Sequence, residues 1–483
     1  MSLKEKTLHG LSWSFIDNFV VKIISFVVGI VLARLIAPSE FGILAYIYFF
    51  VAISSSFVDC GFGAALIRKK DCTSADYSTV FYYNLAVGAL LYVLLFFIAP
   101  LAESFFEVSG FTLILRVTGL SLIISALGGI QYTLLSKRID FKTQTIISLC
   151  TNITSGVVAI ILAYNGFGVW TLVWKSLLGG VISTSLVWIF SDWRPGIVFS
   201  FKSFRELFGF GYKLALSGLI DTVSDYIYYP IIGKRYSTDT LGQFTKASGF
   251  ASLFSSALTS NIQRVTYPVL STIQDNPEKL KLAYRKMIKT TMLVTFACTL
   301  GLAAIAEPLV LILIGEKWLP CVPYLQLMCF SCMLYPLNAM NLNIITVKGR
   351  SDLFLKLEII KQLLYIPLVF TAIYLGIIAL LIGDVIITFI GTYLNIHYSA
   401  KLINYTVKEQ IMDILPFFLI SICVSGLVWC IIFLGWNNFA TIILQIGVGA
   451  LLTIGIYEMK KQPDYRELRQ IGFKFLSKIT GKP

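Results

Sequence analysis

Ionisable residues inside long apolar stretches are the groups of this chain whose placement could do chemistry. Seven are cations, namely Lys22, Arg34, Arg116, Lys175, Arg235, Lys246 and Lys361, and five are carboxylates, namely Asp59, Asp221, Asp225, Glu358 and Asp384. An ionisable side chain within a membrane span is costly and usually faces a cavity or a partner. The cations predict a water-filled, positively charged cavity for an anionic group. The alternative is that the charges pair and lock helices together.

The spacing around Lys22 favours the cavity. Lys22 lies eleven residues into an apolar run that begins near residue 11, which places it about 16 Å deep. Asn18, Ser25, Gly29 and Ala33 continue its face, and Lys246, Gly249, Ser256, Ser260 and Gln263 form a similar stripe. Asp221 and Asp225 are one helical turn apart and should face the same way. Arg34 and Arg235 lie near span ends, where extension of the side chain towards the interface also explains them.

The composition requires a membrane. Hydrophobic residues make up 57% of the 483 residues and charged residues 13%, about half the usual share in soluble domains. This excludes a soluble enzyme, a disordered chain and a disulfide scaffold. The net charge of +13 is spread in short runs between apolar stretches, whereas a nucleic-acid binder clusters its cations on one face. We therefore expect no nucleic-acid partner.

Apolar runs bounded by charges, glycine and proline predict an all-α polytopic membrane protein with fourteen transmembrane helices. The first run extends to Ile36 and is too long for a cleavable signal. The predicted spans are 11–36, 41–66, 77–102, 111–135, 143–164, 167–190, 210–233, 241–263, 290–315, 321–346, 352–374, 376–400, 412–434 and 438–458.

The distribution of lysine and arginine predicts the orientation. With the N-terminus inside, 30 of these residues fall on the inner side and four on the outer side, so both termini are predicted to be cytoplasmic. Amphipathic patterns predict interfacial helices at 201–208 and in the basic tail, on a face formed by Leu468, Ile471, Phe475 and Ile479.

An internal repeat suggests two halves. The segment from Ala33 to Gly42 resembles the segment from Lys234 to Gly242, and each has an arginine followed seven or eight residues later by a glycine. Six spans separate the copies, so they run in the same direction and predict a site between the halves near the midplane. The predicted domains are 1–190 (spans 1–6), 191–209 (linker with an interfacial helix), 210–400 (spans 7–12), 401–458 (the last pair) and 459–483 (tail).

Catalytic motifs are missing from the sequence. It has no H-E-x-x-H, glycine-rich phosphate loop or G-x-S-x-G, and its two histidines are His9 and His397. Cys329 and Cys332 form a CxxC without a second ligand pair, which favours buried thiols over zinc. We expect no catalytic residues, no metal and no enzyme activity.

Several motifs resemble one family. These are Leu8–Trp13, the run from Leu32 to Leu44, the run from Leu134 to Lys142, Leu241–Ala247, and the run from Tyr267 to Lys286. The chain resembles the bacterial polysaccharide transporters, the Wzx-type oligosaccharide flippases of the superfamily that also contains MATE multidrug exporters and lipid II flippases. The second half beyond residue 290 matches mainly in hydropathy.

The resemblance implies two six-helix lobes plus a C-terminal pair, working by alternating access in the bacterial cytoplasmic (inner) membrane. It implies flipping of an undecaprenyl-pyrophosphate-linked oligosaccharide to the outer leaflet for cell-surface polysaccharide biosynthesis, with membrane lipids and polysaccharide-assembly proteins as partners. It implies no cofactor beyond a coupling ion, H⁺ or Na⁺, for which Asp59, Asp221, Asp225, Glu358 and Asp384 are the candidates.

Two alternatives remain open at this point. A MATE-like drug/cation antiporter would favour an acidic cavity, whereas the lysines in the spans point the other way. A membrane enzyme of glycan assembly would need a catalytic residue, and none stands out. On the flippase hypothesis, replacing Lys22 and Lys246 with alanine should leave the protein in the membrane but stop export.

Overall fold

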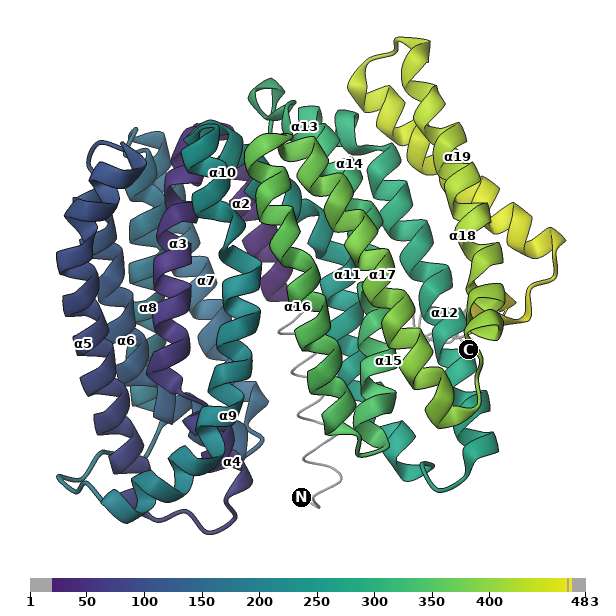
Figure 1. Ribbon diagram of the computed structural model, residues 1–483. Helices are drawn as coiled ribbons and strands as arrows, with labels where there is room; N and C mark the ends of the chain where they lie inside the picture. The colour runs from purple at the N-terminus through teal and green to yellow at the C-terminus, as the bar shows by residue number, and fades with distance from the viewer. Residues whose placement is uncertain (1–19, 467–468, 471–483) are drawn as a thin grey trace, which may run out of the picture. The chain divides into compact units, whose positions relative to one another are not determined.

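The chain is all-helical in the part that the structure describes (Figure 1). This computed structural model describes residues 20–466 and 469–470, with the side chains of all but 213, 260–269, 271, 272, 351 and 372. Nine helices of this part are long and apolar enough to cross a membrane. The predicted all-α polytopic class is confirmed, and the number of fourteen spans stays a prediction. Residues 11–19 of the predicted first span and the apolar face of the predicted tail helix lie outside the described residues.

The chain forms two compact units, Met1–Gly242 and Gln243–Pro483. The helices of unit 1 are α2 (Lys22–Leu35), α3 (Pro38–Asp59), α4 (Phe62–Arg68), α5 (Ser74–Phe106), α6 (Phe111–Lys137), α7 (Phe141–Tyr164), α8 (Val169–Phe190), α9 (Phe201–Tyr226), α10 (Tyr228–Arg235) and the start of α11 (Thr238–Thr272). Within it, α5 packs on α6, α6 and α7 pack on α8, and α2 packs on α7.

Capping residues explain where several of these helices begin. The Thr73 hydroxyl accepts from the Asp76 amide at the start of α5, and the Asp140 carboxylate accepts from the Thr143 amide at the start of α7. Such caps satisfy backbone groups that the helix itself cannot. Glu40 does this for two helices, because its carboxylate accepts from the Ala37 amide before α3 and from the Val169 amide at the start of α8, both at 3.2 Å.

Both ends of α3 touch other helices through glycine. A methyl group on Gly42 would lie 1.8 Å from the Thr238 carbonyl oxygen, and one on Gly242 would lie 1.9 Å from the Pro38 carbonyl oxygen. Only glycine permits so close an approach of two backbones. At the other end, a methyl group on Gly61 would lie 2.4 Å from the Gly211 carbonyl oxygen. Gly42 and Gly242, the equivalent glycines of the internal repeat, therefore pack against each other.

The predicted linker, 191–209, lies within unit 1. The Gly196 and Ser200 amides donate to the hydroxyls of Ser78 and Thr79 on α5. Residues 201–208 form the first turns of α9 rather than a separate helix. The aromatic residues of that stretch pack partly inwards, since the Phe204 and Phe208 rings lie near the buried Phe62 ring of α4.

Unit 2 contains most of α11 and the remaining helices. These are α12 (Pro277–Ala304), α13 (Ala306–Leu313), α14 (Cys321–Cys332), α15 (Tyr335–Val347), α16 (Ser351–Tyr374), α17 (Ile377–Ile403), α18 (Val407–Cys430) and α19 (Asn438–Met459). The predicted inner connection 264–289 is mostly helical, because α11 continues to Thr272 and α12 begins at Pro277. Proline fits the first turn of a helix, and the Asn276 side chain caps it.

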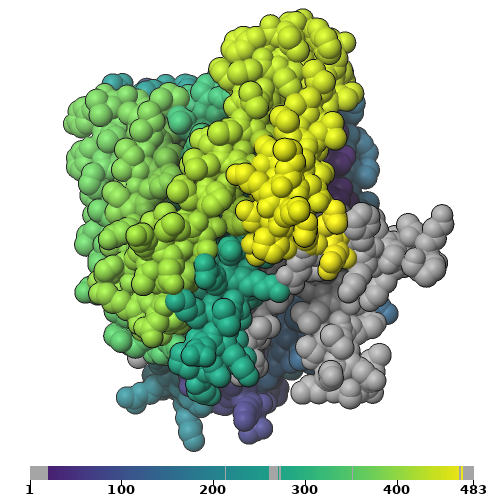
Figure 2. Space-filling model, turned by 90° about the vertical axis from the view of Figure 1, so that its right-hand side faces the viewer, coloured from purple at the N-terminus to yellow at the C-terminus, as the bar shows by residue number. Residues whose placement is uncertain are grey.

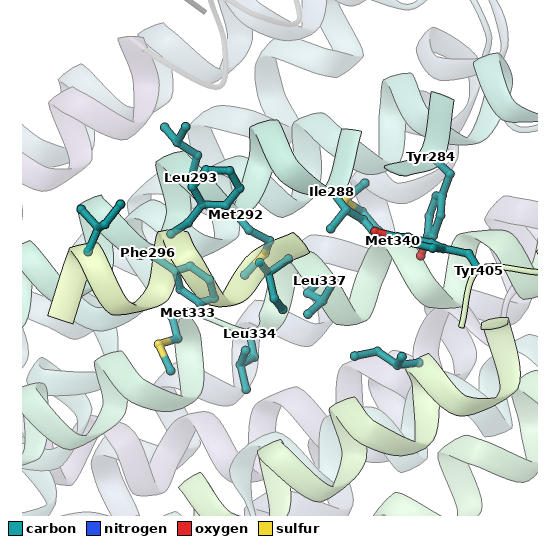
Figure 3. Close-up of a cluster of buried hydrophobic side chains, with 14 of the residues drawn as sticks. Tyr284, Ile288, Met292, Leu293, Phe296, Met333, Leu334, Leu337, Met340 and Tyr405 are labelled. Carbon is teal, nitrogen blue, oxygen red and sulfur yellow. The ribbon is translucent and has the colours of Figure 1, made fainter. Parts of the chain in front are cut away.

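The core of unit 2 is an apolar seam between α12, α15 and α18. Tyr284, Ile288, Met292 and Phe296 recur at one-turn spacing along α12, and they meet side chains from the end of α14 and from α15 (Figure 3). This regular face buries one stripe of each helix. On the other side of α18 lies α19, whose side chains form much of the surface in Figure 2 and are largely exposed.

Candidate functional site

Lys22 and Lys175 are the two predicted cations of unit 1 that have no hydrogen-bond or ion-pair partner among the described residues. Lys22 is exposed at the start of α2, and Lys175 is half-buried in α8. On the same face as Lys22, Ser25 donates to Asn152 of α7 at 2.9 Å, and Ala33 is buried. A lysine ammonium placed in a span without a carboxylate requires an anion or water.

The other cations of unit 1 differ in their surroundings. The Arg116 Nε donates to the Phe96 carbonyl oxygen at 3.1 Å, and its guanidinium carbon lies 3.8 Å from the centre of the Phe96 ring. Arg116 is thus held against α5 by a cation–π contact and a hydrogen bond. Arg34 and Arg235 are exposed in the last turns of α2 and α10.

The carboxylates of unit 1 have separate environments. Asp59 ends α3 and accepts from the Gly63 amide at 3.2 Å, so it caps the start of α4. Asp221 and Asp225 are exposed on α9, and the negative charge of Asp221 acts on Asp225 as their spacing predicted. Asp59 thus has a structural role that the sequence alone did not reveal.

In unit 2 the predicted cations Lys246 and Lys361 have close neighbours. The Lys246 ammonium lies 5.2 Å from the centre of the Trp318 ring, and this tryptophan is fully buried. The Lys361 ammonium pairs with Glu358, one turn away on α16, at 2.5 Å. Lys361 and Glu358 therefore neutralise each other, which is the pairing that the sequence left open as an alternative.

Asp384 is the carboxylate most tightly surrounded by other helices. The hydroxyl of Ser331 on α14 donates to it at 2.6 Å, and Ser331 is 1% exposed. Tyr365 of α16 is a second hydrogen-bond partner, and the Cys332 thiol is a further titratable neighbour. Two neighbouring helices, α14 and α16, thus each supply a hydroxyl donor to one carboxyl group of α17.

Buried polar side chains continue from Asp384 along one face of α17. We call this row the α17 seam, formed by Asp384, Thr388, Thr392, Asn395 and Ser399. The spacing of four, four, three and four residues keeps one helical face. Asn395 donates to Asn338 of α15 at 2.9 Å, and Ser399 bonds to Asn341 of α15. The sequence prediction did not include this row, because the polar stripes it singled out were those around Lys22 and Lys246; the same helical periodicity from Asp384 onward would have revealed it.

Two polar atoms of the α17 seam are buried without a partner among the residues that the structure describes. They are the Thr388 hydroxyl and the Asn395 amide oxygen. Leaving a buried polar atom unpaired costs about 1–3 kcal/mol. Internal water usually satisfies such atoms in proteins.

Beyond Ser399, a charged group forms where α12 meets α18. The Tyr284 hydroxyl has Ser399 and Tyr405 as neighbours, and the Tyr405 hydroxyl donates to Asp413 at 2.6 Å. Arg285 donates two hydrogen bonds to Asp413, at 2.5 and 2.7 Å. Lys289 lies 3.7 Å from the same carboxylate and 3.5 Å from Asp464. We call Tyr405, Asp413, Arg285 and Lys289 the Asp413 cluster.

The structure divides the predicted site residues between the two units. Lys22, Arg34, Arg116, Lys175 and Arg235 lie in unit 1 with Asp59, Asp221 and Asp225, whereas Lys246, Lys361, Glu358 and Asp384 lie in unit 2. Within the described residues no three histidine, cysteine or acidic side chains converge as metal ligands. The single shared cavity for all seven cations stays a prediction.

The family of proteins described as polysaccharide biosynthesis protein matches residues 31–323, more than half of the chain. The chain belongs to this family. The match includes Lys175, the hairpin from Leu32 to Leu44 and the repeat glycines.

Relatives and solved structures agree with the polysaccharide biosynthesis family. Over 428 residues the chain is 24% identical to the lipopolysaccharide biosynthesis protein WzxC of Escherichia coli strain K12, covering 87% of this chain and 86% of that protein. The lipid II flippase MurJ, in an inward closed conformation, has a TM-score of 0.76 at 17% identity, covering 95% of this chain and 99% of that one. A multidrug resistance MATE family transporter, in an inward-facing conformation, has a TM-score of 0.61 at 16% identity, covering 82% and 98%. The predicted family and superfamily fold are therefore confirmed.

Proposed function

We propose that this protein is a flippase that moves an undecaprenyl-pyrophosphate-linked oligosaccharide repeat unit from the cytoplasmic to the outer leaflet of a bacterial cytoplasmic membrane. It does so by alternating access, supplies cell-surface polysaccharide biosynthesis and performs no bond chemistry. Both of its termini face the cytoplasm, as the bias of lysine and arginine predicts.

The observation that carries this proposal is the pair Lys22 and Lys175. Lys175 belongs to α8, which is long and apolar enough to cross a membrane, and Lys22 belongs to the described part of the predicted first span. Both ammonium groups lack a protein partner among the described residues. A pyrophosphate offers several anionic oxygens that a lysine binds as a point charge. Family membership and the resemblance to WzxC support a saccharide attached to that pyrophosphate.

The remaining predicted cations have different parts in this proposal. Arg34 and Arg235, at helix ends, attract the headgroup electrostatically. Lys361 is paired with Glu358 and so contributes less free charge than the sequence suggested, whereas Lys246 lies 5.2 Å from the centre of the neutral Trp318 ring and keeps its charge. The cationic cavity is therefore proposed around Lys22 and Lys175 first.

Depletion of the protein in its bacterium tests the proposal. We expect the extracted lipids to contain a complete undecaprenyl-linked repeat unit that faces the cytoplasm. Accumulation of an incomplete repeat unit would instead place the protein among the enzymes of glycan assembly. No accumulation, combined with new sensitivity to cationic dyes, would favour the drug/cation antiporter and contradict the flippase.

Variants then test the two lysines. Lys22→Gln combined with Lys175→Gln should leave the amount of protein in the membrane unchanged and cause the same lipid to accumulate. Arg116→Gln is the matched control, because its guanidinium is already engaged by Phe96. If the double variant exports normally, the phosphate-binding role of these lysines is wrong.

A further inference from the structure

Unit 2 contains a row of buried polar groups that a purely structural helix contact does not need. The α17 seam spans 16 residues from Asp384 to Ser399, about 22 Å along a helix. That is most of the thickness of a bilayer's hydrocarbon core. An apolar face, like the stripe of Ile288, Met292 and Phe296 on α12 (Figure 3), would pack a helix without polar groups to satisfy.

The unpaired atoms indicate what fills the row. The Thr388 hydroxyl and the Asn395 amide oxygen are buried with no partner among the described residues, and their side chains are 6% and 0% exposed. Both belong to the same face of α17 as Asp384. Polar groups of this kind are the ones that buried waters bind, with two to four hydrogen bonds each.

Each end of the row meets a carboxyl group. At one end, Asp384 is bonded to Ser331 and Tyr365, with the Cys332 thiol as the other titratable neighbour. The Lys361–Glu358 pair lies one to two turns before Tyr365 on α16. At the other end, Ser399 leads through the Tyr284 hydroxyl to Tyr405 and the Asp413 carboxylate. The Asp413 cluster is on the lysine- and arginine-rich side of unit 2, which we predict to be cytoplasmic.

We propose that the α17 seam holds a file of ordered water molecules that carries protons between Asp384 and the Asp413 cluster. The Asp384 carboxylic acid releases its proton to the adjacent water, and each water of the file passes one proton on as it receives another. The last water releases the proton to solvent beside Tyr405 and Asp413. No electron moves, and Asp384 is left as a carboxylate that can bind a proton again.

The surroundings of Asp384 favour a proton over a metal cation. Its hydrogen-bond partners are the hydroxyl groups of Ser331 and Tyr365, and it belongs to no cluster of three or more potential metal ligands among the described residues. A hydroxyl can donate to a carboxylate or accept from a carboxylic acid, so it serves both protonation states. The proton path is a property of unit 2 alone, while its role as the driving force of export rests on the proposed function.

Infrared spectroscopy of the full-length protein in lipid nanodiscs tests the path without any substrate. We expect a carboxylic acid carbonyl band that disappears as the pH is raised and that is missing in Asp384→Asn. On transfer to D₂O the band should shift quickly, because water reaches the group. Thr388→Val and Asn395→Leu should each slow this shift about tenfold.

A control variant distinguishes the loss of ordered water from the α17 seam from a general structural effect of removing a hydroxyl group in unit 2. Thr371→Val removes a hydroxyl that bonds to its own helix on α16 at 2.8 Å, and it should leave the exchange rate unchanged. Exchange unaffected by Thr388→Val and Asn395→Leu would overturn the water file. A band that disappears with added sodium at constant pH would overturn the proton and assign a metal cation to Asp384.

The link to export has its own readout. Asp384→Asn should accumulate the same lipid-linked intermediate as depletion does, with normal amounts of protein in the membrane. Normal export by this variant would overturn the coupling, even with the infrared results as expected. If depletion itself accumulates nothing, the proposed function is wrong and the infrared test of the path still stands.

Discussion

Helices α3 and α17 hold their neighbours in opposite ways. In unit 1, α3 approaches other helices backbone to backbone at Gly42 and Gly61, with no polar side chain at the closest contacts. In unit 2, α17 meets α14 and α15 through a row of hydroxyl and amide side chains, two of whose atoms lack a protein partner.

The glycine contacts of α3 and the polar contacts of α17 should differ in how well they tolerate substitution and water. A glycine contact leaves no room for water or for even one added methyl group, and so it is rigid and intolerant of substitution. A polar contact holds through several hydrogen bonds, each worth little in a membrane protein, and it can admit water. Substitutions should therefore harm the two regions to different degrees.

The largest effect is expected at the glycine contact. Gly242→Ala forces the Pro38 carbonyl away and should lower the free energy of unfolding by about 3 kcal/mol, near the upper end of overpacking costs. SDS titration in mixed micelles measures this change. Gly249→Ala, on the same helix with open space around its Cα hydrogen, should be neutral or stabilising by up to about 1 kcal/mol. Equal effects of the two substitutions would show that the close approach does not constrain the helices.

The second largest effect on the free energy of unfolding is expected at the Asp413 cluster, beyond the Ser399 end of the α17 seam. Asp413→Ala leaves Arg285 and Lys289 without their shared carboxylate, and it should cost about 2 kcal/mol because Arg285 keeps partial access to solvent. Glu409→Gln is the control: it weakens the more exposed pair with Lys281 and should cost less than about 1 kcal/mol. The same micelle titration compares them. A smaller loss of unfolding free energy in Asp413→Ala than in Glu409→Gln would show that the ion pairs of Asp413 do not stabilise unit 2.

A double-mutant cycle within the α17 seam should change the free energy of unfolding by less than Asp413→Ala does. Asn395→Ala leaves Asn338 without its partner and should cost about 1 kcal/mol, whereas replacing both asparagines by leucine should be nearly neutral. Unfolding in micelles measures each variant of the cycle. If the double replacement costs more than the sum of the single ones, the hydrogen bond is not what holds α15 to α17.

The smallest effect concerns a surface ion pair of unit 1 and its pH dependence. The Lys234 ammonium, 2.6 Å from Glu107, holds the pKa of that carboxyl below its ordinary value of 4.5. The stabilisation is therefore present above pH 4.5 and is lost as the pH falls through the lowered pKa. We expect Lys234→Gln to flatten this acid-side loss of thermal stability. An unchanged slope in melting scans from neutral to acid pH would contradict the pairing.

The fold was predictable wherever one helix buries one apolar run. Most predicted spans coincide with helices because twenty apolar residues have few other solutions in a bilayer. The predicted span boundaries are wrong where capping residues or a turn, which hydropathy does not detect, set the end of a helix. Asn276 and Pro277 begin α12 thirteen residues before the predicted span, and Cys60 and Gly61, both in the left-handed region, break the predicted second span into α3 and α4.

The candidate site was less predictable because partners come from distant parts of the chain. Ser331 is 53 residues from Asp384, and nothing near either residue announces the contact. By contrast, the Lys361–Glu358 pair is three residues apart and could have been recognised from helix spacing. The internal repeat matched Gly42 with Gly242, but sequence similarity between two segments does not predict that the segments are in contact, as these two glycines are.

The carboxylate of Glu40 has a consequence for motion. Because it caps the starts of α3 and α8 together, neither helix can be drawn away from the other without exposing unpaired backbone amides at both. We expect these two ends to travel as a single rigid segment in any conformational cycle. A hinge of unit 1 must therefore lie away from the starts of these two helices.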